Sequence, residues 1–354
     1  MLASRVVKRR ASLLLVVAVL AFGCDKRSAP GSASSSSDNQ GELKFALTGL
    51  DTKIERRLDG LWTTAGLDKA MDAFVEGVIA EPSLAEGGSK LFEALGSDPK
   101  LSAELEKVMN GLVQSPRVQQ LIAAMMAAHP GEDIGKLAGD KVGQAWELPA
   151  ISKGFEDAFQ QLLGKVDVKG ELGAISRGIE ARVAGIFNDG ARTAKWTKRI
   201  TELNGGTRPS PDQATQLYLD HAWSEARMQK FLTTILSNKT LQVETARFLA
   251  DLIALPPIDA ELRRSVGEIA ADPQLQQAAS ELMIQLLDEH PDVATVTAAQ
   301  RQLLTSPLTV KAAQRLAHIV LADPKVAELA GMHLGKIAAD PVLRAAFDDL
   351  IDHW

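Results

Sequence analysis

Residues 323–343 read DPKVAELAGMHLGKIAADPVL, and this stretch carries the pattern that decides the fold. Asp-Pro stands at its start and again at residues 340–341, and an apolar residue follows each proline two positions later. Aspartate caps the free N–H groups at the start of a helix, and proline suits the first helical position because it has no N–H to leave unpaired. The stretch therefore predicts a helix of about 13 residues followed by a turn of about four. The apolar residues at helical spacing are Val326, Leu329, Ala330, Leu334 and Ile337.

The same proline setting recurs along much of the chain. The first three such prolines, and again the last five, follow one another at intervals of about 17 residues. Repetition at this period predicts an all-α protein, an array or bundle of antiparallel helical hairpins built from single-helix repeats of about 17 residues. The prolines are Pro82, Pro99, Pro116, Pro273, Pro291, Pro307, Pro324 and Pro341.

A longer repeat indicates that the body of the chain consists of two related halves, residues 42–206 and residues 211–354. The sequence PRVQQ at residues 116–120 returns as PQLQQ at residues 273–277. The joint between the halves is the run NGGTRPSP at residues 204–211, whose composition breaks helices.

Two tryptophans occupy matched positions in these halves. The sequence LDGLW at residues 58–62 returns as LDHAW at residues 219–223. Because both tryptophans lie among apolar neighbours, we expect Trp62 and Trp223 to anchor the cores of their halves.

Residues 131–206 contain 13 of the 27 glycines of the chain. Four of them, Gly131, Gly135, Gly139 and Gly143, are spaced four residues apart and would line one face of a helix. Such a face allows close approach of a neighbouring helix, or it makes the helix loose and locally unstable. A membrane-active segment is a further alternative.

The N-terminus has the pattern of an export signal. Residues 1–23 contain a basic start and a ten-residue apolar run from Leu13 to Phe22, which predicts a signal peptide. The following Ala21-Phe22-Gly23-Cys24 resembles the lipobox of bacterial lipoproteins, and Cys24 is the single cysteine of the chain. The resemblance implies that lipid is attached to Cys24. Ordinary signal-peptidase cleavage after a small residue is the alternative.

The predicted anchor and the charge of the chain indicate where the protein acts. Residues 24–41 are rich in serine and predict a flexible tether between the lipid and the helical body. We expect a bacterial cell-envelope protein on the periplasmic face or the cell surface, and Asp25 favours the inner membrane. The formal net charge of −6 disfavours nucleic acid as a partner.

Motifs that carry chemistry are scarce in the sequence. It contains no metalloprotease His pair, phosphate-binding loop, dinucleotide fingerprint or nucleophile elbow, so we expect no metal, cofactor or catalytic residue. His129 and His290 both precede a proline, and we interpret them as polar N-terminal caps or turn residues. The C-terminal acids Asp348, Asp349 and Asp352 favour a frayed, solvated helix end over a weak cation site.

These observations predict a membrane-anchored envelope lipoprotein that acts as a non-catalytic helical-repeat binding or scaffold module. Its partners would be the membrane, through the lipid on Cys24, and a protein or peptide. Two alternatives stay open. One is an envelope enzyme with a carboxylate site that no motif marks. The sequence therefore leaves enzymatic activity undecided, although the missing motifs disfavour it. The other is a membrane-active or lipid-binding helical bundle.

Overall fold

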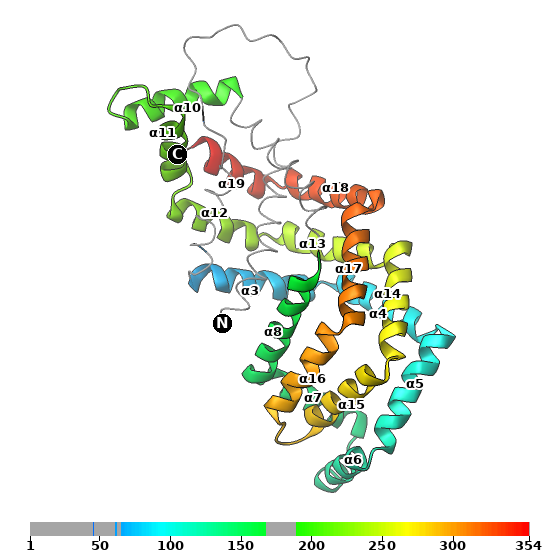
Figure 1. Ribbon diagram of the computed structural model, residues 1–354. Helices are drawn as coiled ribbons and strands as arrows, with labels where there is room; N and C mark the ends of the chain where they lie inside the picture. Colours follow the sequence, from blue (N-terminus) through cyan, green and yellow to red (C-terminus); the bar gives the residue numbers. More distant parts are fainter. Residues whose placement is uncertain (1–44, 46–60, 62–64, 168–188, 354) are drawn as a thin grey trace. The chain divides into compact units, whose positions relative to one another are not determined.

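The computed structural model describes residue 45, residue 61 and residues 65–167 and 189–353. Regular secondary structure in these residues is α-helical, which confirms the predicted all-α class. The predicted signal peptide, residues 1–23, and the predicted tether that begins at Cys24 lie outside the described residues. The helices (Figure 1) are α3 (Ala65–Ile79), α4 (Pro82–Gly96), α5 (Pro99–Gln114), α6 (Pro116–Ala128), α7 (Ile134–Glu147), α8 (Pro149–Lys165), α10 (Gly190–Leu203), α11 (Pro211–Ala222), α12 (Glu225–Leu236), α13 (Lys239–Ile253), α14 (Pro256–Ala270), α15 (Pro273–Leu287), α16 (Val293–Thr305), α17 (Pro307–Ala322), α18 (Pro324–Ala339) and α19 (Pro341–Asp352).

Proline stands at the first position of most described helices, as the repeated Asp-Pro and Ser-Pro pairs predict. The preceding aspartates act as caps by accepting hydrogen bonds from the first backbone N–H groups. Asp272 accepts from the N–H groups of Gln274 and Leu275, at 2.9 and 3.0 Å. Seven of the eight predicted prolines begin a helix, although Ser115 before α6 makes no side-chain cap bond.

Pro291 is the exception, and the prediction of a helix start there is wrong. Helix α16 begins at Val293, and Asp292 is its cap. The Asp292 carboxylate accepts from the N–H of Ala294 at 3.1 Å and from the Thr295 hydroxyl at 2.5 Å. These two bonds place the helix start beyond the proline.

The helices are longer and the turns shorter than the sequence predicts. Helix α5 contains 16 residues and α14 contains 15, whereas about 13 were expected from the repeat. Only Ser97 and Asp98 separate α4 from α5. Their N–H groups donate to the carbonyls of Glu93 and Leu95, which satisfies acceptors at the end of α4 without a longer turn.

The described residues divide into two compact units. Unit 1 contains residues 86–167 and 251–326, and unit 2 contains residues 65–85, 189–250 and 327–353 together with residues 45 and 61. The predicted joint at residues 204–211 lies in unit 2, between α10 and α11. The division of the sequence into two related halves stays a prediction.

The core of unit 2 contains Trp223, which is 5% exposed, so the predicted role of this tryptophan as a core anchor is confirmed. Trp62 lies outside the described residues. Trp196 and Tyr218 lie in the same core, with ring centroids 4.6 Å apart. Aromatic burial of this kind contributes much of the free energy of folding because each ring removes a large area from water.

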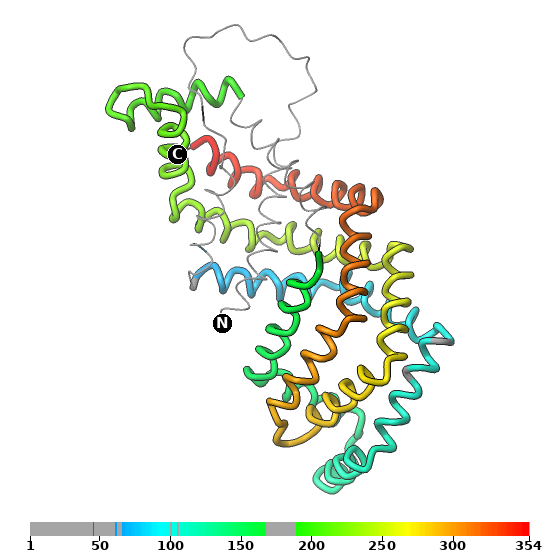
Figure 2. The backbone as a smooth tube through the Cα atoms, in the orientation of Figure 1, coloured from blue at the N-terminus to red at the C-terminus, as the bar shows by residue number. Residues whose placement is uncertain are grey.

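Two pairs of consecutive helices in unit 2 run on end to end instead of folding back. Helix α13 continues the line of α12, and α19 continues the line of α18 (Figures 1 and 2). The prediction of antiparallel hairpins is therefore wrong for these pairs. Phe231 of α12 and Leu241 of α13 are buried in the same core, so the chain need not reverse to bury both helices. Helix α12 packs instead against α3 and α19.

Unit 1 contains two runs of helices in which neighbours along the chain do pack together. These runs are α5 to α8 and α14 to α17. A small core between them contains Ala145 and Ile151 from the first run and Leu286 and Val296 from the second. Each run thus covers an apolar face of the other.

The glycines of α7 do not mark a close helix contact. A methyl group built on Gly139 or Gly143 would meet no atom within 4 Å, and both residues are exposed. The expectation of close packing at these glycines is therefore wrong, and an exposed glycine face remains. Gly131 adopts φ +86° in the turn before α7, a conformation that glycine tolerates best. Among the described helices, none combines the length and apolar character that a membrane span requires.

Candidate functional site

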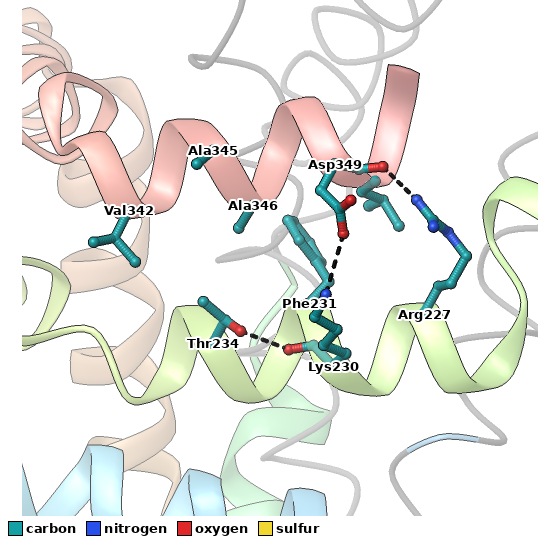
Figure 3. A pocket seen from close by; sticks show the side chains of 9 residues that line it. Arg227, Lys230, Phe231, Thr234, Val342, Ala345, Ala346 and Asp349 are labelled. Carbon is teal, nitrogen blue, oxygen red and sulfur yellow. Dashed lines mark hydrogen bonds and ion pairs between the residues drawn. The ribbon is translucent and has the colours of Figure 1, made fainter. Parts of the chain in front are cut away.

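A groove lies between α12 and α19 of unit 2 and encloses about 250 Å³ (Figure 3). The edge-on contact of Phe231 with Phe347, with ring centroids 5.0 Å apart, fixes the spacing of the two helices. Leu232 and Leu350 are buried in the core that these helices share. The residues that line this α12–α19 groove are Arg227, Lys230, Phe231, Thr234, Val342, Ala345, Ala346, Asp349 and Leu350.

One end of the groove is charged. The Arg227 guanidinium donates through Nε to the carbonyl of Ala222 at 2.9 Å and through Nη2 to the carbonyl of Asp349. Lys230 Nζ lies 3.5 Å from the Asp349 carboxylate, and the Lys230 side chain is 76% exposed. Backbone carbonyls do not neutralise Arg227, so this end carries two cations and one carboxylate.

The other end of the groove is apolar and shallow. Val342 is 54% exposed, and the small side chains of Ala345 and Ala346 leave space between the helices. The Thr234 hydroxyl is turned away into a hydrogen bond with the carbonyl of Lys230, at 2.9 Å. In Figure 3 these side chains project from the two helices into the same gap.

The volume of the groove limits what it can hold. Sites for small molecules usually enclose roughly 300–1,000 Å³ and surround most of the ligand. The α12–α19 groove is smaller and open to solvent on one side, so it suits one or two side chains of a larger partner. The lining residues include one carboxylate and no histidine or cysteine.

The C-terminal helix that forms this groove is docked, and the predicted frayed end is wrong. Phe347, Leu350 and Ile351 are buried in the core of unit 2. The acids that were expected to destabilise the helix end have cationic neighbours: Asp349 faces Lys230, and Asp352 lies 3.5 Å from Arg192. These contacts offset the unfavourable helix dipole.

A buried carboxylate stands apart from the groove in unit 2. Glu244 of α13 accepts from His333 Nδ1 at 2.7 Å, from Arg247 at 2.7 Å and from Lys336 at 3.2 Å. Burial alone would raise the pKa of Glu244, but the hydrogen bonds from these three cationic or polar groups outweigh it and lower the pKa. A general acid needs the opposite shift.

A second acidic cluster joins α14 to α17 in unit 1. Arg315 Nε donates to Glu261 at 2.5 Å, and its Nη2 donates to Glu268 at 2.8 Å and to Ser265 at 3.3 Å. Hydrogen bonds from Arg264 and Arg315 lower the pKa of Glu268. Both clusters are ion pairs that hold helices together, and neither opens into the groove.

His129 and His290 lie in turns, one of the two roles that the sequence predicts, and neither caps a helix start. His129 ends α6, because its N–H donates to the carbonyl of Met125. His290 lies in the turn after α15, with its N–H 3.2 Å from the Asp288 carboxylate. Asp133 and Asp292 cap the next helices instead, since their carboxylates accept from the first free N–H groups. In the described part of the chain, no cluster of three or more His, Cys, Asp or Glu residues is placed to hold a metal ion.

Neither the groove nor the Glu244–His333 pair was predicted from the sequence. His333 was detectable, because it lies within the apolar stripe of 323–343 at helical spacing from Val326 and Ile337. A polar residue on a buried face requires a partner, but nothing in the sequence points to Glu244, 89 residues away. Cys24, the one site residue predicted, lies outside the described residues.

Comparisons of the chain with protein-family models, with curated protein sequences and with solved structures find no match. The arrangement of helices and the residues of the groove are therefore the basis for a functional proposal.

Proposed function

We propose that this protein is a membrane-anchored envelope lipoprotein whose helical body binds a segment of a partner protein in the α12–α19 groove. The observation that carries the binding proposal is the groove itself: an apolar hollow for a side chain, next to a cationic end. Lipid on Cys24 and the tether that follows it would hold the body near the membrane. The export pattern of residues 1–23 and the single cysteine support this anchor.

The proposal includes a body built from two related helical halves. Matched helices begin at nearly constant separation in the sequence. Pro99 and Pro256, which begin α5 and α14, are as far apart as Pro116 and Pro273, which begin α6 and α15. The separation of the first residues of α8 and α17 is almost the same. Stacked single-helix repeats present a broad surface to a partner without any chemistry, which suits a scaffold.

The groove favours a partner segment with an apolar side chain beside an acidic one. An apolar side chain would cover Val342 and Ala346 and remove their exposed area from water. A carboxylate would meet Lys230 and Arg227, which together outnumber Asp349 at this end. Cationic side chains outnumber the carboxylate at this end of the groove, although the whole chain has a net negative charge. An acidic partner segment would therefore bind at this end.

Site-specific crosslinking from the groove tests this function. A photoreactive residue is placed at Ala345 of the anchored protein in native envelopes, and crosslinked peptides are identified by mass spectrometry. We expect one partner whose crosslinked peptide contains an apolar residue next to Asp or Glu. Lys230→Glu and Ala346→Trp should reduce this crosslink by roughly tenfold, because they reverse a charge and fill the hollow.

Two matched variants serve as controls. Lys195→Glu reverses an exposed lysine on α10, and Ala327→Trp enlarges an exposed alanine on α18, and neither residue lines the groove. Both should leave the crosslink unchanged. Cys24→Ala tests the anchor separately, since it should release the protein from membranes. Crosslinks only to lipid or glycan, or a crosslink that Lys230→Glu leaves intact, would overturn the binding proposal.

A further inference from the structure

Residues 204–210 connect α10 to α11, and we call them the junction. The chain segments on either side of the junction pack against each other along their length. We call them the N-terminal half (α3 to α10) and the C-terminal half (α11 to α19). In unit 1, α5 packs on α14, α6 and α7 pack on α15, and α8 packs on α16 and α17. In unit 2, α3 packs on α12. Helices of the two halves therefore meet in the same order along both segments.

Polar contacts in unit 1 also join one half to the other. Arg117 of α6 lies 2.6 Å from Asp288, and Lys141 of α7 lies 3.4 Å from Glu289. At the end of α8, Lys165 Nζ donates to the carbonyl of Thr305 at 3.2 Å. Each of these bonds crosses the interface between the halves, so the interface has a defined register as well as an apolar core.

The contact of α8 with α16 is the tightest part of this interface. A methyl group built on Gly154 would lie 2.7 Å from Gln300 Oε1 and 2.8 Å from Thr297 Oγ1, so a larger residue would have to displace these side chains. Gln300 is 1% exposed, and its Nε2 donates to the carbonyl of Ile151 at 3.2 Å. The surfaces thus fit each other closely in shape, and a buried hydrogen bond joins them.

Neither half forms a compact unit from its own helices. Both unit 1 and unit 2 combine segments from the two sides of the junction. A half that separates from its partner would expose the apolar residues that the other half covers, including Ile151 in one half and Val296 in the other. The same surface is available on any second copy of this chain.

The junction joins the halves covalently through an exposed turn at Gly205 and Gly206. These glycines adopt φ +69° and +82°, which other residues rarely adopt. Bonds between neighbours hold the turn: Asn204 Nδ2 donates to the Thr207 carbonyl at 3.0 Å, and the Thr207 hydroxyl donates to the Asn204 carbonyl at 2.9 Å. Straightening the turn breaks these bonds and uncovers Pro209, which is buried, whereas the contacts between the halves described above lie outside the turn.

We propose that the chain forms an exchanged dimer, in which the N-terminal half of one copy packs on the C-terminal half of a second copy. The junction at residues 204–210 is extended in this dimer, and every contact between the halves is kept between the two copies. This self-association uses the interface between the halves and does not depend on the partner proposed for the α12–α19 groove.

The test uses the full chain with Cys24→Ala, refolded at low and at high protein concentration. Gly205→Val with Gly206→Val disfavours the closed turn, so this double variant should shift the chain from monomer to dimer at equal concentration. Sedimentation gives the mass, and circular dichroism should show unchanged helix content. If the double variant fails to fold, the wild-type junction refolded at high concentration carries the same test.

Charge reversal shows whether a dimer is exchanged. Chains with Arg117→Asp are refolded together with chains that carry Asp288→Arg. In an exchanged heterodimer both pairs bring opposite charges together, whereas each homodimer opposes like charges. We expect the ratio of heterodimer to homodimer to be roughly five times the ratio that random mixing gives. A protein that stays monomeric throughout, or a dimer that mixes in the statistical ratio, would overturn the proposal.

Discussion

The Glu244 carboxylate and the His333 ring lie 2.7 Å apart, and both side chains are buried where α13 meets α18. Arg247 and Lys336 approach the same carboxylate from more exposed positions. The Glu244 carboxylate thus accepts hydrogen bonds from side chains of both α13 and α18. Removing a single member of such a buried pair usually costs more than the pair itself contributes, because the other member is left without a partner.

We therefore expect Glu244→Gln to lower the free energy of unfolding by about 3 kcal/mol at pH 7. The pKa of Glu244 is lowered from 4.5 in the folded protein, so its contribution is present above that pH and is lost as the pH falls through the lowered value. The difference between wild type and variant should shrink accordingly below pH 4.5. Denaturant unfolding at pH 7, 5 and 3 measures it.

Glu86→Gln is the matched control for this prediction. Glu86 pairs with Lys90 one turn away, at 2.6 Å, and both side chains are about two-thirds exposed. The variant should unfold like the wild type at each pH, because exposed pairs of this kind contribute little. An equal loss in both variants would show that burial at Glu244 has no special effect.

Replacing Arg315 alone should lower the free energy of unfolding more than replacing Arg315 and its buried partner Glu261 together. Arg315→Met leaves Glu261, which is 8% exposed, without its guanidinium and should destabilise unit 1 by about 3 kcal/mol. Adding Glu261→Leu should recover most of that loss, since an apolar pair of similar size packs without an unpaired charge. Thermal and denaturant unfolding of the single and double variants compare them. A double variant less stable than Arg315→Met would contradict this account.

The glycines of unit 1 should respond to alanine in opposite directions. Gly139→Ala and Gly143→Ala meet open space on an exposed helix face, so each should stabilise α7 by about 1 kcal/mol. Gly154→Ala would place a methyl group 2.7 Å from Gln300, and we expect a loss of about 2 kcal/mol. Hydrogen exchange in α7 and global unfolding are the readouts. If Gly143→Ala destabilises the protein, the added methyl group must meet a neighbouring atom, and the account of an open helix face at this glycine would be wrong.

The helix starts were the most predictable part of the fold, because they depend on local chemistry. An Asp-Pro pair supplies both the cap and a residue without an N–H, and no distant residue is needed. Pro291 failed for an equally local reason: Asp292 offers a cap directly after the proline. When one polar residue precedes a proline and another follows it, the sequence alone does not show which of the two caps the helix.

The groove and the direction of consecutive helices could not be predicted in this way. Whether α13 folds back on α12 depends on which faces find apolar partners, and those partners are on α3 and α19, far away in the sequence. The groove likewise exists because Ala345 and Ala346 happen to face Thr234. Periodicity reports that a helix has an apolar face, but it does not report what covers that face.

Asp340 combines a helix cap with a contact between distant segments, and this makes its removal informative. Its carboxylate accepts from the N–H groups of Val342 and Leu343, at 2.9 and 3.0 Å. It also accepts from the Thr240 hydroxyl at 2.6 Å and from Asn238 at 3.2 Å. Asp340→Ala should therefore cost about 2 kcal/mol, more than a cap alone.

The pH dependence and a control distinguish this double role. Burial would raise the pKa of Asp340, but the bonds from Thr240 and the backbone lower it from 3.8, so the contribution is lost only as the pH falls through that lowered value. Asp272 precedes α15 in the same proline setting and caps that helix through the N–H groups of Gln274 and Leu275. Asp272→Ala should cost about 1 kcal/mol, the usual contribution of a cap. If both substitutions cost the same at pH 7, the link from Asp340 to Thr240 and Asn238 adds nothing, and capping alone explains why the Asp-Pro pair begins α19.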